Sequence, residues 1–584
     1  MKLFKQLGYI FPTKQRWQFA GLFFLMLIET LLDFAGVSLI LPFVNILVNA
    51  DSMGGAWWYQ LIVRITGAKD IKQVLLFITL LMIAIYIIKN AYILFLTNLR
   101  VHFLTKRQIA MGTKMLTCYM HKPYTFHLQK NTAEIVRNVN SDVGGAFSAI
   151  SNVFLLVSDI LIIAMLVAYL FAVDVMLTVS IIMALGFCSA LYFLLVRKKI
   201  RKAGQQNRES AAKMIQAVQQ SMGGIKEVKV MGREAYFADV YRREGTKYGE
   251  QRRKYAMIAA IPGRLIETLC MGSVLGVIAW KIASGADLLE VVPSLSAFAV
   301  AAMRLLPKAN SINACISNIT YTLPSLDSLY TDLTESDRIE LERARMVEEK
   351  KRKAKPQTAG KKNIVIRNLS YAYPNMDKQV LHDVNMTIEE GSSVGIVGVT
   401  GAGKTTLVDL ILGVLEPGSG TICYGNLDIH QDYARWQKHI GYIPQNIYLI
   451  DDSIRKNVAL GVDEEDIDEA AVWRALENAQ LAQFVRGLKD GLDTVIGERG
   501  VRISGGQRQR IGIARALYYD PEILFFDEAT SSLDNETEAA VMDAVNTIGN
   551  SKTMIIVAHR LTTISNCDKV YNVENAGVHE TKRP

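Results

Sequence analysis

The sequence predicts an α-helical membrane domain followed by an α/β domain of ordinary soluble composition. Three observations predict this arrangement. All the apolar segments of spanning length that we identify lie in the first 309 residues. Residues 1–362 carry a net charge of +20, whereas residues 363–584 carry −11. Beyond residue 363, short apolar runs alternate with helical segments, as they do in α/β domains.

Six segments have the length and composition of membrane spans. They lie near residues 19–49, 74–99, 147–171, 175–196, 257–280 and 291–309. The intervening loops predict the orientation, because Lys and Arg are enriched on the cytoplasmic side. Residues 99–145 contain seven Lys or Arg and residues 197–256 contain sixteen, whereas 172–174 and 282–290 contain none. We therefore expect both termini in the cytoplasm.

The loops and the chain start carry further helical signals. The two basic loops are long and helix-prone, so we expect the spanning helices to extend into the cytoplasm. The N-terminal "MKLFKQLGYIFPTKQRWQ" predicts an amphipathic helix on the cytoplasmic membrane face rather than a cleavable signal peptide. In the outer loop, "WWYQLIVRI" (57–65) favours an interfacial helix slightly over a plain hydrophobic turn. Six scattered cysteines without a CxxC pair indicate neither a metal site nor a disulfide framework.

Composition also predicts the domain boundaries. Residues 1–334 form the membrane domain with its cytoplasmic extensions. The charged stretch 335–362, which ends in Pro and Gly, is typical of a linker. Residues 363–584 form the α/β domain, in which "SVGIVG", "EILFFD" and "TMIIVAH" predict buried parallel strands.

A phosphate-binding loop opens the second domain. "GVTGAGKTT" (398–406) follows a predicted strand and precedes a predicted helix, a context that disfavours an accidental Gly-rich turn. The glycines allow backbone N–H groups to surround phosphate oxygens. Lys404 is expected to reach the β- and γ-phosphates and Thr405 to bind Mg²⁺. The loop residues predicted to bind ATP are Gly398, Thr400, Gly401, Ala402, Gly403, Lys404, Thr405 and Thr406.

Two further motifs fit a nucleotide site. In "ILFFDEAT" (523–530) a strand ends in Asp527, suited to Mg²⁺, and Glu528, suited to polarising the attacking water. In "RISGGQRQRIGIARAL" (502–517) a turn of Ser504, Gly505 and Gly506 begins a basic helix and predicts an anion site. Each motif alone would be an ordinary strand end or helix cap.

The order of these motifs resembles the ATP-binding cassette (ABC) ATPases, with Gln445 in "YIPQN" and His559 in "VAHRL" at the expected places. The resemblance implies that Glu528, His559 and Gln445 act in hydrolysis and that Gln445 joins Thr405 and Asp527 near Mg²⁺. It implies ATP and Mg²⁺ as cofactors, and adenine stacking on Tyr373. It further implies ATP contacts by Ser504, Gly505, Gly506, Gln507 and Asp534. Ile503 stands where Leu is usual, an apolar exchange. One cassette with six spans resembles a half-transporter of the ABC exporter fold, which implies a homodimer.

Charged residues interrupt the predicted spans. Lys89, Arg264, Arg304 and Lys308 lie in or beside apolar segments. In one interpretation they pair with Glu29, Asp33 or Glu267, since charges inside a membrane usually pair. In the other they form a basic belt in a substrate cavity for an anionic ligand. Arg304 has small residues on its own face, which favours a position inside the bundle.

Several membrane phrases resemble the PglK-type flippases of lipid-linked oligosaccharides. They include "SLILPF" (38–43), "MRLLPKAN" (303–310) and "QKNTAEIVRNVNSDV". The resemblance implies ATP-driven flipping of a polyprenyl-diphosphate-linked oligosaccharide across a bacterial inner membrane, with the ATPase domain in the cytoplasm. A general lipid or multidrug exporter is the alternative. A cassette ATPase without transport is a third class, which the six spans disfavour, and we expect no nucleic-acid partner.

Overall fold

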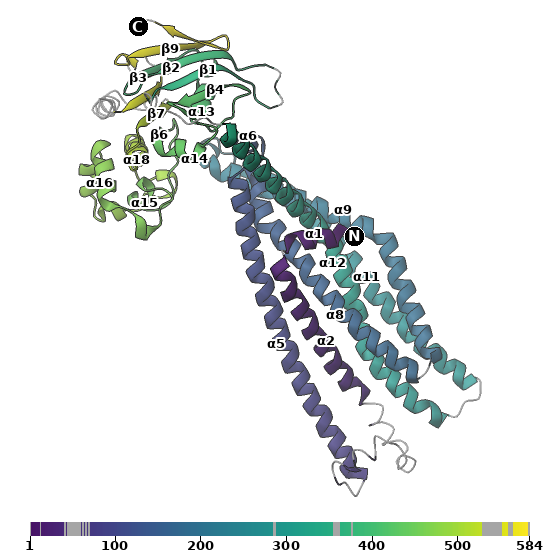
Figure 1. The fold of residues 1–584 in the computed structure, drawn as a ribbon. Helices are drawn as coiled ribbons and strands as arrows, with labels where there is room; N and C mark the ends of the chain where they lie inside the picture. Colours follow the sequence, from purple (N-terminus) through teal and green to yellow (C-terminus); the bar gives the residue numbers. More distant parts are fainter. Residues whose placement is uncertain are drawn as a thin grey trace. The chain divides into compact units, whose positions relative to one another are not determined.

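Figure 1 shows the fold in a computed structural model. The structure describes residues 2–11, 13–39, 43, 60, 63–64, 67, 71–173, 175–283, 288–353, 362–374, 376, 378–527, 552–558 and 564–581. The chain divides into two compact units. The first comprises residues 1–122 and 130–340, and the second comprises 123–129 and 341–584.

Long helices build the first unit. They are α1 (Lys2–Ile10), α2 (Thr13–Ser38), α5 (Ile71–Met120), α8 (Val143–Val173), α9 (Val175–Gly223), α11 (Glu234–Ala283) and α12 (Leu288–Lys353). Three stretches within the described residues are long and apolar enough to cross a membrane: Trp17–Gly36, Lys72–Met120 and Thr132–Phe171. The other three predicted spans fall within α9, α11 and α12. The helical membrane domain predicted from the sequence is confirmed.

The predicted helix extensions beyond the membrane spans are also present. Helices α5, α9 and α11 contain 50, 49 and 50 residues, more than twice the ~20 residues that cross a bilayer. Short elements join them: α7 (Thr132–Arg137) and the π-helical turn η2 (Asn138–Asp142) precede α8, and α10 (Ile225–Val230) follows α9. Helix α1 packs on α12, where Gln6 Nε2 donates to Asp327 Oδ1 over 2.7 Å and the Tyr9 hydroxyl donates to Asp337.

Two predicted connecting segments, the linker 335–362 and the outer-loop helix 57–65, can be compared with the structure only in part. The stretch 335–353 is not an irregular linker, because α12 continues through it to Lys353. Its sequence is rich in Glu, Arg and Lys, all good helix formers, which explains the continuation. The proposed interfacial helix 57–65 falls almost wholly outside the described residues.

Two sheets build the second unit. The larger has the strand order β10-β9-β3-β8-β7-β6, and the smaller has the order β2-β1-β4-β5. The strands are β1 (Ile364–Tyr371), β2 (Leu381–Ile388), β3 (Ser393–Val397), β4 (Ser419–Tyr424), β5 (Leu427–Asp428), β6 (Ile440–Ile443), β7 (Ile523–Asp527), β8 (Thr553–Val557), β9 (Lys569–Glu574) and β10 (Gly577–Thr581). Strands β7 and β8 are buried along their whole lengths, as their continuous apolar runs predict.

Helices pack around these sheets. They are α13 (Lys404–Ile411), α14 (Tyr433–Trp436), α15 (Ile454–Val458), α16 (Glu469–Asn478), α17 (Ala482–Arg486) and α18 (Gly505–Leu517). One apolar core joins α13 to strands of both sheets, and a second joins α15 to α18 with β6, β7 and β8. The short helix α6 (Tyr124–Gln129) also belongs to this unit, although it precedes most of the first unit's helices in the sequence.

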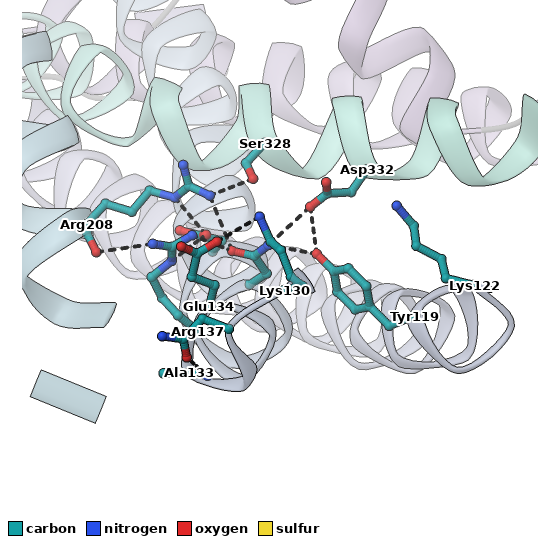
Figure 2. A network of polar contacts seen from close by, with 12 residues as sticks. Tyr119, Lys122, Lys130, Ala133, Glu134, Arg137, Arg208, Ser328 and Asp332 are labelled. Carbon is teal, nitrogen blue, oxygen red and sulfur yellow. Dashed lines mark hydrogen bonds and ion pairs between the residues drawn. The ribbon is translucent and has the colours of Figure 1, made fainter. Parts of the chain in front are cut away.

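A buried polar network ties the helix extensions of the first unit together (Figure 2). Asp142 accepts from Arg208 Nε over 2.8 Å, from Arg137 Nε over 3.3 Å and from Ser325 Oγ over 2.8 Å. Nearby, Asp332 Oδ2 accepts a hydrogen bond from Tyr119 over 2.6 Å. The network therefore joins α5, η2, α9 and α12 by charge-assisted hydrogen bonds.

Candidate functional site

The predicted nucleotide-binding residues follow the carboxyl ends of parallel strands. The 398–406 loop follows β3, and Asp527 is the last residue of β7. Gln445 lies two residues beyond β6, and His559 lies two residues beyond β8 in the sequence. Strands β3, β8, β7 and β6 are parallel neighbours, so these ends meet at one edge of the sheet, where ligands bind in such folds. Glu528, Asp534 and His559 lie outside the described residues.

The backbone of the phosphate loop is shaped for an anion. Gly401 and Gly403 have φ values of 82° and 106°, in the left-handed region that glycine adopts without strain. A Cβ atom on Gly398 would lie 2.4 Å from the carbonyl oxygen of Val573, so this turn excludes a side chain. Lys404 is buried, and its Nζ donates to the carbonyl of Gly398 over 2.9 Å. The loop fits the phosphates of ATP, with Lys404 held in position by its own backbone.

Tyr373 lies beside the start of α13. Its hydroxyl is 3.1 Å from the hydroxyl of Thr406, and its ring packs edge-on against Tyr371. The buried Thr406 thus supports the loop through Tyr373, while Thr405 is exposed. Thr400 and Ala402 lie in the same loop. The adenine contact expected of Tyr373 stays a prediction.

Two residues that the sequence reasoning missed surround Asp527. The Tyr442 hydroxyl donates to Asp527 Oδ2 over 3.4 Å. Asp409 lies on α13, and burial together with the charge of Asp527 raises the pKa of Asp409 to about 6. An acid within the apolar segment "TTLVDLIL" was the signal that could have revealed it. The neighbouring carboxylates of Asp409 and Asp527 fit Mg²⁺, which prefers oxygen ligands and would supply charge that offsets the triphosphate.

The Ser-Gly-Gly turn begins α18 as predicted. Ser504 Oγ accepts from the N–H of Gln507 over 3.2 Å, and Gln507 Oε1 accepts from the N–H of Ser504 over 2.9 Å. This capping box fixes the helix start. Ser504 and Gly505 are exposed, and a Cβ on Gly505 would meet nothing within 4 Å. The turn therefore has open space for a ligand, as the resemblance to the cassette ATPases requires.

The membrane charges are mostly paired. Lys89 Nζ lies 2.5 Å from Asp33 Oδ1, and both side chains are buried, with exposed fractions of 5% and 9%. Lys308 Nζ contacts Asp159 Oδ1 at 2.9 Å. Of the two interpretations, pairing with Asp33 therefore describes Lys89, since a buried charge requires a partner. The sequence reasoning missed Asp159, although it interrupts an apolar span just as Arg304 does.

The remaining two cations differ from Lys89. Arg264 contacts Glu267 over 3.2 Å on the same helix, and both side chains are more exposed than buried. The side chain of Arg304 lies outside the described part of the structure. Glu29 Oε2 accepts from Ser158 Oγ over 3.3 Å. All three described cations are therefore paired. The pair of Lys89 is buried, whereas Arg264 and Lys308 keep 87% and 30% of their side chains exposed.

Comparison with known proteins identifies both units. A family model for the ABC transporter transmembrane region matches residues 38–284, and the ABC transporter model matches residues 381–531. An ATP-dependent lipid A-core flippase from Alkalilimnicola ehrlichii is 31% identical over 480 residues, covering 79% of this chain and 77% of the relative. One from Cupriavidus pinatubonensis is 29% identical over 507 residues, covering 84% and 81%.

A solved structure agrees on the fold. A bacterial Atm1-family ABC exporter with ATP bound superimposes with a TM-score of 0.74 at 21% identity, over 97% of this chain and 95% of that one. The match to a transport domain contradicts the alternative of a cassette ATPase without transport. This chain therefore belongs to the ABC transporter family, as an exporter half whose ATPase domain hydrolyses ATP with Mg²⁺ to drive transport.

Proposed function

We propose that the chain acts as a homodimer that flips a phosphate-bearing glycolipid to the outer leaflet of a bacterial inner membrane. The observation that carries this proposal is the charge inside the membrane unit. Lys308 keeps 30% of its side chain exposed although it is paired with a buried Asp159. An exporter of purely apolar compounds has no need of such groups, which are expensive in a membrane.

Within this class we propose a polyprenyl-diphosphate-linked oligosaccharide as the substrate. Its diphosphate would bind Arg264, Lys308 and Arg304, which the sequence predicts to face the cavity. In a partly desolvated cavity charge-assisted hydrogen bonds are strong. Lys89 is not among the proposed substrate-binding cations, because it pairs with Asp33 and contributes to helix packing. The relatives named as lipid A-core flippases favour a second candidate, a lipid A-type glycolipid, since it also combines phosphate with sugars.

Two surfaces support the homodimer. On α10, Val230 is 80% exposed and Met231 at its end is 69% exposed, an apolar surface that needs a partner. The Ser504 turn is also exposed, and within the described part of one chain nothing lies within 4 Å of a Cβ on Gly505. We propose that α10 contacts the partner's ATPase domain and that Ser504 completes the partner's nucleotide site.

On this basis, the nucleotide cycle drives the transport cycle. Two ATP molecules between the ATPase domains would pull them together and close the cytoplasmic side of the cavity. The segments near 119–125 and 222–232 would transmit this movement close to Gln445. Helix α6, which begins at Tyr124, supports this role, because it belongs to the nucleotide-domain unit although it precedes most of the membrane helices in the sequence.

Reconstitution tests the substrate. Vesicles containing the full chain and a labelled polyprenyl-diphosphate glycan should show ATP-dependent loss of label from the leaflet that faces the ATPase domain. Parallel vesicles carry a lipid A-type glycolipid or a neutral apolar dye. If only the lipid A-type compound moved, the substrate would be reassigned to that class. If only the dye moved, the proposal of a substrate with an anionic head group would be wrong.

A further inference from the structure

A cavity of about 640 Å³ opens between α9 and α12 in the first unit. This volume lies within the roughly 300–1,000 Å³ of small-ligand sites. Four cations line it from α9, namely Lys198, Arg201, Lys202 and Arg208. Two acids, Asp327 and Asp332, line it from α12. The lining therefore carries an excess of positive charge.

Both acids already have partners. Asp327 accepts from Gln6 Nε2 over 2.7 Å and from Arg201 over 3.0 Å. Asp332 Oδ2 accepts from the Tyr119 hydroxyl over 2.6 Å and from Asn138 Nδ2 over 3.2 Å. The carboxylates are thus engaged by groups other than the cavity lysines.

Lys198 and Lys202 are the uncompensated charges. No acidic group in the described part of the chain lies within 4.0 Å of either ammonium. They are four residues apart on α9, so they lie on one face of the helix. Arg208 lies one to two turns further along and bonds Asp142 and Ser328 (Figure 2). An anion in the cavity would therefore contact the ammonium groups of Lys198 and Lys202 at the end near the membrane span. The guanidinium of Arg208, fixed by Asp142 and Ser328, lies further along α9.

The end of the cavity at Lys198 lies close to a predicted membrane span. The uncharged segment 175–196 ends two residues before Lys198, so these lysines follow directly on the membrane span. At this level the phosphates of cytoplasmic-leaflet lipids lie beside basic side chains. A lipid whose chain stays in the bilayer can place its phosphates between α9 and α12 without leaving the membrane.

We propose that this cavity receives the diphosphate head group of the lipid substrate before it enters the central cavity. This inference rests on the proposed function, which it deepens by assigning a first binding site. Lys198 and Lys202 contact the phosphate oxygens. The simpler alternative is that these lysines only attract anionic lipids to the membrane surface, as juxtamembrane cations generally do.

A matched pair of variants separates these explanations. Lys198→Gln with Lys202→Gln removes the two cavity charges. Arg197→Gln with Lys199→Gln removes two charges from the same helix and the same level, but neither residue lines the cavity. All four side chains are exposed, so both variants should fold. Lys198→Arg with Lys202→Arg keeps the charge and should restore binding.

The measurement is binding of a fluorescent polyprenyl diphosphate to the full-length protein in phosphatidylcholine nanodiscs. We expect about tenfold weaker binding for the Lys198 and Lys202 variant, the loss of one charge-assisted hydrogen bond or more. The Arg197 and Lys199 variant should bind within twofold of wild type. Polyprenol without phosphate should bind all three proteins alike. Equal weakening of both variants, or of neither, would overturn the cavity site.

Two additional arms identify the source of the phosphate and separate the two proposals. Inorganic pyrophosphate should compete weakly, whereas an equal affinity for it and the lipid would overturn a lipid site in favour of a free anion. If vesicles show no ATP-driven flipping but the lysine dependence of binding persists, the proposed function fails and the site stands. If flipping occurs with wild-type lipid affinity in the Lys198 and Lys202 variant, the site alone fails.

Discussion

Arg208 Nε donates to Asp142 Oδ2 over 2.8 Å, and this bond ties α9 to the π-helical turn η2. Asp142 is buried, and its carboxylate also accepts hydrogen bonds from Arg137 Nε and Ser325 Oγ. One acid thus compensates two cations where four helical segments, α7, η2, α9 and α12, meet. Turns of the π type are uncommon and recur at functional positions, which fits a joint between moving helices.

Asp142→Ala should destabilise the membrane unit more than any surface change. The substitution leaves Arg137 and Arg208 without their shared anion, and removing one partner of a buried pair costs about 3–5 kcal/mol. Thermal unfolding of the full chain in detergent measures this loss. Asp239→Ala breaks an exposed ion pair with Arg242 and should cost less than about 1 kcal/mol. Equal losses would show that Asp142 is not a structural centre.

Gly204→Ala should separate α9 from α12. A Cβ on Gly204 would lie 2.0 Å from the carbonyl oxygen of Tyr321, a distance that forces backbone movement. We expect a lower unfolding temperature and a weaker coupling of ATP hydrolysis to transport, since the helices that line the basic cavity would shift. Gly186→Ala on the same helix is the control, because nothing lies within 4 Å of its Cβ. The control substitution should favour the helix by about 1 kcal/mol. A similar fall in unfolding temperature in both variants would contradict a close contact at Gly204.

The sequence predicted the architecture well because its signals are local. Span length, the excess of Lys and Arg on one side and the order of the ATPase motifs each depend on neighbouring residues. The glycine loop and the Ser504 cap were predictable for the same reason, since their conformations follow from residue types within a few positions.

The sequence named Asp33 and Glu267 among the possible partners of the membrane cations, but it could not assign each pair. Lys89 meets Asp33 across 56 positions, and Lys308 meets Asp159 across 149, so helix packing decides both. The helical continuation of α12 was missed because Pro356 and the charge of the segment suggested a linker, whereas its helix-forming residues determined the structure. Asp409 was missed because its effect depends on the strand that brings Asp527 beside it.

Glu528→Gln tests the assigned general base. The amide cannot accept a proton from the attacking water, so ATP binding should persist while hydrolysis falls by about 10²–10⁴-fold. Nucleotide binding and phosphate release, measured on the same preparation, separate the two effects. Hydrolysis near the wild-type rate would remove Glu528 from its role.

Asp409 predicts a pH dependence of stability in the nucleotide domain. Its pKa lies near 6 in the folded state against an ordinary 3.8, so the folded protein holds the proton more tightly. The stabilisation is present below pH 4 and is lost as pH rises through about 6. At 1.36 kcal/mol per pKa unit this amounts to about 1–3 kcal/mol, allowing for partial exposure.

Asp409→Asn should therefore stabilise the nucleotide-free domain at pH 7.5 and do so less at pH 4.5. Thermal unfolding in EDTA measures the difference, because Mg²⁺ near Asp527 would change the local charge. Glu465→Gln is a suitable control, since that side chain is exposed. A stability gain that is the same at both pH values would show that the carboxylate of Asp409 does not titrate in this range.

The contact between Lys89 and Asp33 decides whether Lys89 belongs to the substrate site. Lys89→Met leaves a buried carboxylate, and Asp33→Asn leaves a buried ammonium, so each single variant should lose about 3–5 kcal/mol of stability. The double variant removes both charges and should be more stable than either single one. Thermal unfolding gives the coupling free energy.

ATP-dependent flipping by the same three variants completes the test. If Lys89 only neutralises Asp33, the double variant should recover flipping together with stability, because no substrate contact has been removed. If Lys89 held the phosphates, the double variant would be stable but inactive. Arg264→Gln is the comparison, since its exposed cation remains in the proposed substrate set. This change should weaken transport of the diphosphate lipid while unfolding stays within about 1 kcal/mol of wild type.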